Sequence, residues 1–135
     1  MNEATTVLFV DDDRDFLDSK KAYLEARGYR VLTAESPETA LALLEKATPS
    51  IIFLDLMMEH VDDGFRLGYQ IGKDERLRHI PRVMLSAVAA ETGTRFDGEA
   101  TGLREWSGLT RFLDKPVTGK QVLSIIEELA VKGSS

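Results

Sequence analysis

Two short apolar runs in this sequence each lead directly into aspartate. Residues 7–10 (VLFV) precede three consecutive acids at 11–13, and residues 51–54 (IIFL) precede Asp55. An apolar run of four is too short for a typical helix and is typical of a strand buried on both faces of a parallel sheet. Parallel strands end at the same edge of a sheet, where open α/β folds bind their ligands. We therefore expect the acids after both runs to lie together at that edge.

Carboxylates gathered at one sheet edge repel one another and resist ionisation. A cation among them relieves this repulsion, and carboxylate oxygens are the ligands that a hard divalent ion such as Mg²⁺ prefers. The sequence therefore predicts a metal site built on these acids.

The rest of the chain alternates between strand and helix patterns. Helix caps are predicted at Asp13, Ser36 and Thr118, and Gly28 is a predicted C-terminal stop. Helical spacing predicts helices at about 14–27, 36–46 and 65–75, and from 118 onward, with Asp63-Gly64 as the cap of the third. Strands are predicted at 7–10, 29–34, 51–54, 82–85 and 111–113. Five strand–helix units indicate an α/β fold with a doubly wound parallel sheet.

Composition narrows the class of protein. A chain of 135 residues, 43% hydrophobic and 30% charged, predicts a single domain over 1–135 with its core at about 5–131. The absence of cysteine excludes disulfides, thiolate zinc sites and a cysteine nucleophile. A net charge of -6 argues against direct binding of nucleic acid. We find no signal-peptide pattern and no membrane-spanning stretch, so the cytoplasm is the expected location and no membrane partner is expected.

Four of the five predicted strands end on polar groups in a fixed order. Asp11 and Asp12 come first, then Asp55, then Ser86, and finally Lys115 before a proline. Each motif alone is common, but the ordered set resembles the receiver domain of two-component response regulators over nearly the whole chain. The resemblance implies a five-stranded flavodoxin-like (βα)5 receiver fold. It also implies a phosphorelay function rather than a turnover enzyme.

The resemblance implies a role for each acid. Asp55 would be the phosphoacceptor, which forms an aspartyl phosphate. Mg²⁺ would be held by Asp12 directly, by Asp11 through water, by Asp55 and by the backbone carbonyl of Met57. So few protein ligands suit Mg²⁺, which keeps several of its waters.

The resemblance also implies three groups that respond to the phosphoryl group. Lys115 would place a positive charge on the phosphoryl oxygens, and Ser86 would donate a hydrogen bond to one of them. Phe112 occupies the family's aromatic switch position. Each has a plainer interpretation, in which Lys115 is a surface lysine, Phe112 is core and Ser86 is incidental.

The implied partners are proteins. A sensor histidine kinase or a phosphotransfer protein would phosphorylate Asp55. A downstream protein target, or a second copy of the domain, would bind the face made by the fourth helix, fifth strand and fifth helix. Because no output domain follows the last helix, we expect a stand-alone receiver.

The sequence departs from the family pattern in two loops. The loop after Asp55 lacks the usual proline and is one residue longer, a change that can place either Glu59 or His60 near the mouth of the site. The segment between Ser86 and Lys115 is several residues longer than usual, so we expect a remodelled fourth helix region. Within it, Leu103 and Trp106 are three apart and are expected to share an apolar helical face, either packed on the core or presented to a partner.

Two apolar residues bear on how long the phosphoryl group lasts. In receivers, the positions two after the phosphoacceptor and two after the conserved hydroxyl flank the path of the attacking water. Here they are Met57 and Val88, which cannot hydrogen-bond that water. We therefore expect slow self-dephosphorylation.

Two other functions remain open. An aspartate-nucleophile phosphohydrolase also uses acids at strand ends, but it carries a second aspartate two residues after the nucleophile, where this chain has Met57. A phosphorylation-independent interaction module on the same fold is the other alternative.

Overall fold

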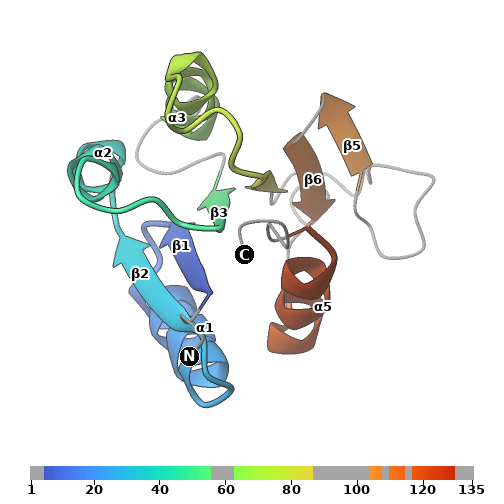
Figure 1. Cartoon of the computed structure of the whole chain (residues 1–135). Coiled ribbons are helices and arrows are strands. Elements are labelled where there is room, and N and C mark those ends of the chain that lie inside the picture. The colour runs from blue at the N-terminus through green and yellow to red at the C-terminus, as the bar shows by residue number, and fades with distance from the viewer. Residues whose placement is uncertain (1–4, 56–62, 87–103, 108–109, 115–116, 130–135) are drawn as a thin grey trace.

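The computed structural model describes residues 5–55, 63–86, 104–107, 110–114 and 117–129 (Figure 1). The strands are β1 (Thr6–Val10), β2 (Arg30–Ala34), β3 (Ile51–Asp55), β4 (Arg82–Ser86), β5 (Arg104–Ser107) and β6 (Thr110–Asp114). The helices are α1 (Arg14–Glu25), α2 (Pro37–Leu44), α3 (Asp63–Lys73) and α5 (Gly119–Leu129).

All described strands belong to one sheet, in the order β2-β1-β3-β4-β6-β5. Five of these strands, β2, β1, β3, β4 and β6, pair with their neighbours in parallel. This pairing confirms the predicted doubly wound parallel sheet. The strand order reverses at β1, since the chain moves outward to β2 and then crosses to β3. In open α/β sheets this reversal marks the ligand-binding crevice, outside the carboxyl ends of the strands.

β5 is an addition that the sequence did not predict. It pairs antiparallel with β6, with Arg104 opposite Phe112 and Glu105 opposite Arg111. The predicted helical face of Leu103 and Trp106 is therefore wrong for residues 104–107, which are extended. A single pair of apolar residues three apart is too little to define a helix when a strand edge can pair with the segment. The remainder of the expected fourth helix region, residues 87–103, lies outside the described residues.

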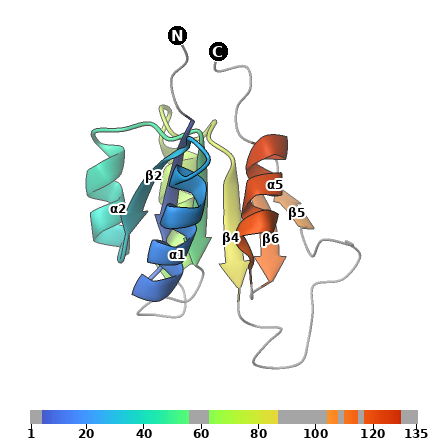
Figure 2. The ribbon, with the colours of Figure 1, turned by 90° about the horizontal axis from the view of Figure 1, so that it is seen from below.

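The core has two layers, one on each face of the sheet (Figures 1 and 2). α1 and α5 cover one face, and α2 and α3 cover the other. Successive strand residues point to opposite faces, so Val7 and Phe9 pack towards α1 and α5 while Leu8 and Val10 pack towards α2 and α3. Every residue of β3 is buried, as expected of a strand covered on both sides.

The helix caps follow the sequence signals closely. The carboxylate of Asp13 accepts the Phe16 N–H at 3.2 Å, and the Ser36 hydroxyl accepts the Thr39 N–H at 3.2 Å. Gly28 has φ +92°, a conformation that favours glycine.

The last helix begins with the predicted capping box. The Thr118 hydroxyl accepts the Gln121 N–H at 3.1 Å, and the Gln121 side chain accepts the Thr118 N–H at 2.9 Å. The third helix differs from prediction, since α3 already begins at Asp63 rather than after Gly64. Among the described helices, none combines the length and apolar character needed to cross a membrane.

Candidate metal centre

Strand ends bring the predicted acids together. β1 and β3 are neighbours, with Val10 opposite Leu54, and Asp11 and Asp55 are the next residues of the two strands. Asp12 follows in the loop to α1. Carboxylate oxygens of all three aspartates lie within 4.8 Å of one another. The structure therefore brings together three of the predicted site residues.

The three aspartates differ in their exposure. Asp11 is 1% exposed and Asp55 is 5% exposed, whereas Asp12 is exposed to solvent. The cluster therefore combines two buried carboxylates with one that is exposed to solvent.

Asp11 also orders the loop that follows it. Its Oδ1 atom accepts the backbone N–H of Asp13 at 2.9 Å, so this oxygen is occupied within the protein. Asp13 in turn caps α1, which confirms that it is a helix cap. Loop 11–13 thus runs from a buried strand end to a capped helix, and Asp12 lies between two residues with structural roles.

The remaining predicted groups belong to the next strands along the same edge. Asp55 is opposite Leu85, and the next residue, Ser86, is opposite Asp114 at the end of β6. The backbone of Ser86 therefore lies at the edge of the sheet that carries Asp11 and Asp55, which we call the acid edge. The side chain of Ser86 lies outside the described residues. Lys115 follows Asp114 directly in the chain but is itself outside the described residues.

Phe112 is partly buried and packs against the cluster on the α2 and α3 face. It lies on β6 opposite Met84. This placement agrees with a core contribution and leaves the switch role a prediction. Three further residues, Met57, Glu59 and Val88, lie outside the described residues, so the expectations for them stay predictions.

A contact at the rim of the site was not foreseen from the sequence. Nη2 of Arg14, the first residue of α1, lies 2.6 Å from Oε2 of Glu35, in the turn after β2. The two residues are far apart in the sequence, and no local spacing signals the pair. Only the parallel pairing of β1 with β2 brings the two turns together.

A buried cation lies on α1. Lys20 is 8% exposed, and its Nζ lies 4.6 Å from the centre of the Phe16 ring. Burial lowers the pKa of Lys20, and the charge of Asp13 partly opposes this effect. Lys20 therefore carries its charge at a cost that solvent-exposed lysines do not have.

The acids fit a Mg²⁺ ion. Three carboxylates this close repel one another, and a divalent cation between them converts the repulsion into attraction. One of the three is exposed, so an ion held there can keep the waters that Mg²⁺ gives up reluctantly. Asp11, Asp12 and Asp55 would hold it.

Comparisons with known proteins agree with this fold. The model of the response regulator receiver domain family matches residues 7–127. Response regulator PleD of Caulobacter vibrioides is 34% identical over 123 residues, which are 91% of this chain and 25% of PleD. An uncharacterized 14.6 kDa protein of Leptolyngbya boryana is 33% identical over 90% of this chain and 87% of its own length.

Other similar proteins extend beyond this chain. The DNA-binding dual master transcriptional regulator RpaA of Synechocystis is 32% identical over 91% of this chain, which spans 48% of RpaA.

Among solved structures, the chemotaxis response regulator CheY4 of Vibrio cholerae has a TM-score of 0.71 at 24% identity. The match covers 94% of this chain and 99% of the CheY4 chain. That similarity establishes the fold. Given the family match over almost the whole chain, this protein belongs to the receiver domain family of the response regulators of two-component systems.

Proposed function

We propose that this receiver domain, a single domain over residues 1–135, accepts a phosphoryl group on Asp55 in a magnesium-dependent reaction. The observation that carries the proposal is the convergence of three carboxylates within 4.8 Å at the end of β1 and β3. A carboxylate at such a place can act as nucleophile, because the strand fixes its position beside the two other acids.

The transfer step moves the phosphoryl group from a donor to Asp55. A carboxylate oxygen of Asp55 forms a bond to phosphorus while the bond from phosphorus to the donor breaks. With a phosphohistidine of a sensor kinase or phosphotransfer protein as donor, the leaving imidazole takes the electron pair of the P–N bond and a proton from solvent. The product is an aspartyl phosphate.

Side chains of this chain hold the reaction in place. Asp11 and Asp12 would bind Mg²⁺ together with Asp55 and the Met57 carbonyl. The bound ion supplies positive charge that offsets the charge of nucleophile and phosphoryl group. Asp11 uses one oxygen to order the loop, and its carboxylate keeps acceptor capacity for the ion or for a water bound to it.

Lys115 and Ser86 would bind the phosphoryl oxygens once the group is on Asp55. The strand pairing supports these two roles, because Ser86 is opposite Asp114 at the acid edge and Lys115 is the next residue after Asp114. A charge-assisted hydrogen bond from each would favour a state in which Ser86 is drawn in and Phe112 is turned inward. Each preference of about 1.4 kcal/mol shifts the population of that state tenfold.

The signal would then pass to a protein partner. We propose that a downstream target or a second copy of the domain recognises the face that includes β6 and α5. The acidic charge of the chain supports a protein rather than nucleic acid as the direct partner.

The test is incubation with a small phosphodonor, with and without Mg²⁺, followed by intact-mass measurement. We expect one phosphoryl adduct that requires Mg²⁺, is abolished by Asp55→Asn and is strongly reduced by Asp12→Ala. A full adduct on Asp55→Asn would contradict the assignment. A folded wild-type protein that binds Mg²⁺ but is never phosphorylated would instead favour a phosphorylation-independent interaction module.

A further inference from the structure

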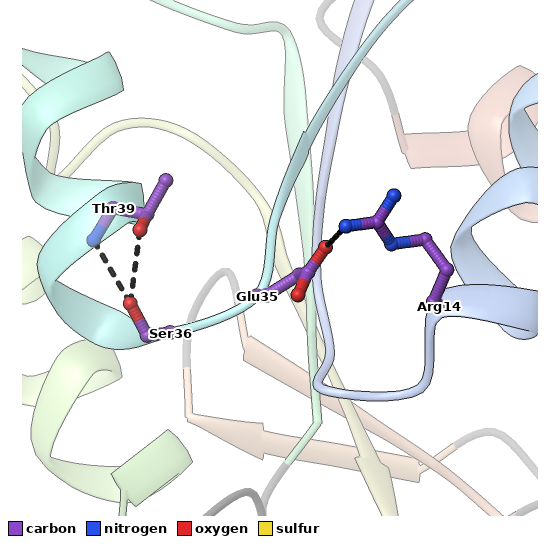
Figure 3. A network of polar contacts seen from close by, with 4 residues as sticks. All are labelled: Arg14, Glu35, Ser36 and Thr39. Atoms are coloured by element: carbon purple, nitrogen blue, oxygen red, sulfur yellow. Dashed lines mark hydrogen bonds and ion pairs between the residues drawn. The ribbon is translucent and has the colours of Figure 1, made fainter.

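Loop 11–13 is tied at both ends to the C-terminal end of β2 and the residue that follows it. At its start, the backbone N–H of Asp11 donates to the carbonyl oxygen of Ala34 at 3.0 Å. Just beyond its end, the Arg14 guanidinium meets the Glu35 carboxylate at 2.6 Å (Figure 3). Two consecutive residues, the last of β2 and the first after it, therefore contact the two ends of the loop that carries Asp11 and Asp12.

The turn that provides these anchors is itself fixed. Ala34 ends β2, in register with Val10. Ser36 caps α2, with its hydroxyl 3.2 Å from the Thr39 N–H and 3.0 Å from the Thr39 hydroxyl. In Figure 3 the Glu35 side chain points to Arg14 while Ser36 turns to Thr39. Glu35 lies between a strand end and a helix cap, so its backbone has little freedom to move.

The position of Asp12 depends on both anchors. It lies between Asp11, whose backbone is bonded to β2, and Asp13, whose side chain caps the helix that Arg14 begins. Asp12 itself is exposed, so burial in the core does not fix its position. An ion that binds a loose loop must order it, and fixing each backbone residue costs conformational entropy. A loop that is already ordered loses less entropy when the ion binds.

We propose that the Arg14–Glu35 pair is a clamp that holds loop 11–13 in its metal-binding conformation. Both are then positioning residues of the magnesium site, although neither is a ligand. This inference rests on the proposed function, since it assumes Mg²⁺ at Asp11, Asp12 and Asp55. The pair is exposed, 69% and 49% at the two side chains, so its contribution is modest and sensitive to salt.

A purely electrostatic role would give a different pattern. The Arg14 cation repels Mg²⁺ and the Glu35 anion attracts it, so removing each charge alone would change the affinity in opposite directions. Those two effects would add in the double variant. A clamp instead makes the effect of one residue depend on the presence of the other.

The experiment is a double-mutant cycle on Mg²⁺ affinity. The dissociation constant is measured by titrating Mg²⁺ into the unphosphorylated full chain and following backbone amide shifts by NMR. The proteins are wild type, Arg14→Gln, Glu35→Gln and the double variant. Arg14→Gln should raise the Mg²⁺ dissociation constant more when Glu35 is present than in the Glu35→Gln background. We expect the two fold-changes to differ by roughly two- to fivefold.

Two controls keep the result specific. Lys21→Gln removes a cation from the same helix without touching the pair, and it should change the affinity equally in both backgrounds. Melting temperatures without Mg²⁺ should be close to wild type for all variants, because exposed substitutions of this kind change stability little.

The outcomes separate the clamp from the proposed function. Equal fold-changes for Arg14→Gln in the two backgrounds would overturn the clamp and leave the magnesium site intact. A wild-type protein with no saturable Mg²⁺-dependent shifts would overturn the metal site, and the clamp with it. A roughly two- to fivefold difference between the two backgrounds would support both the clamp and the magnesium site.

Discussion

The ring of Tyr23 on α1 lies against Gly119, the first residue of α5, so closely that a β-carbon on Gly119 would stand 2.8 Å from the ring's Cγ. The Arg27 guanidinium also packs on the Tyr23 ring, with its central carbon 3.7 Å from the ring centre. The two helices that cover one face of the sheet therefore meet where α5 begins, and the contact requires a residue without a side chain.

Gly119→Ala should destabilise the protein. Overpacking a rigid ring costs roughly 1–3 kcal/mol, and the better helix propensity of alanine returns about 1 kcal/mol or less. Thermal unfolding should show a lower melting temperature for this variant. In a Tyr23→Leu background the same substitution should be much less harmful, since the ring is gone.

Gly72→Ala is the matched control. Gly72 is also in a helix, but a β-carbon there would meet only the end of Arg82, at 3.7 Å, which is ordinary van der Waals contact. It should raise the free energy of unfolding by up to about 1 kcal/mol. Destabilisation of similar size by both alanines would show that close packing at Tyr23 is not the cause.

Lys20→Met should stabilise the protein at neutral pH. Burial lowers the pKa of Lys20 from 10.5, so the folded protein holds this proton less tightly than the unfolded chain does. Below the folded-state pKa the full cost of burying the charge is present. As the pH rises from the folded-state pKa towards 10.5, stability from this group is regained.

The advantage of Lys20→Met over wild type should therefore be largest at neutral pH and should shrink as the pH approaches 10.5. Urea unfolding of both proteins at pH 7 and pH 10 measures the difference. An advantage that grows with pH would contradict the sign of the shift. Exposed Lys46→Met serves as the control, because it makes the same change of side chain outside the core.

Mg²⁺ should raise the melting temperature of the unphosphorylated protein. Binding to the folded state alone stabilises it by about 1.4 kcal/mol when the ion is at ten times its dissociation constant, or roughly 4 °C for a domain of this size. Calorimetry with and without Mg²⁺ measures the shift. Asp12→Ala should abolish it, whereas exposed Asp18→Ala on α1 should retain it.

Without metal, wild type should lose its advantage in melting temperature over Asp12→Ala. Asp12→Ala removes one of three crowded carboxylates, so it should melt no lower than wild type in the presence of a chelator. A wild-type melting temperature indifferent to millimolar Mg²⁺ would argue against the site.

The phosphorylated state should be long-lived. Met57 and Val88 flank the predicted path of the attacking water and cannot hydrogen-bond it. Loss of the adduct over time should be slow in wild type and faster when Met57→Asn is combined with Val88→Glu. Rapid wild-type decay that the double substitution does not accelerate would refute this shielding, and slowing by Glu59→Ala would identify that residue as the water-positioning group.

Much of the fold could be predicted because its signals are local. The apolar runs at 7–10 and 51–54 can be buried only in a central strand, and both are fully buried in β1 and β3. Caps at Asp13, Ser36 and Thr118 depend on side-chain contacts three residues away, so the sequence contains all that defines them.

The acid cluster could be predicted for a topological reason. Parallel strands end at one edge, so Asp11 and Asp55 had to meet once β1 and β3 were neighbours. By itself the sequence thus determined the parallel sheet, its capped helices and the gathering of the acids, because each follows from short-range patterns and strand direction.

The tertiary structure decided what depends on residues distant in the chain. β5 forms only because β6 offers a strand edge, and the local pattern around Trp106 pointed to a helix instead. The Arg14–Glu35 pair and the fit of Tyr23 on Gly119 each join separate elements. Their existence depends on how the elements are placed in space, and no spacing along the chain encodes that placement.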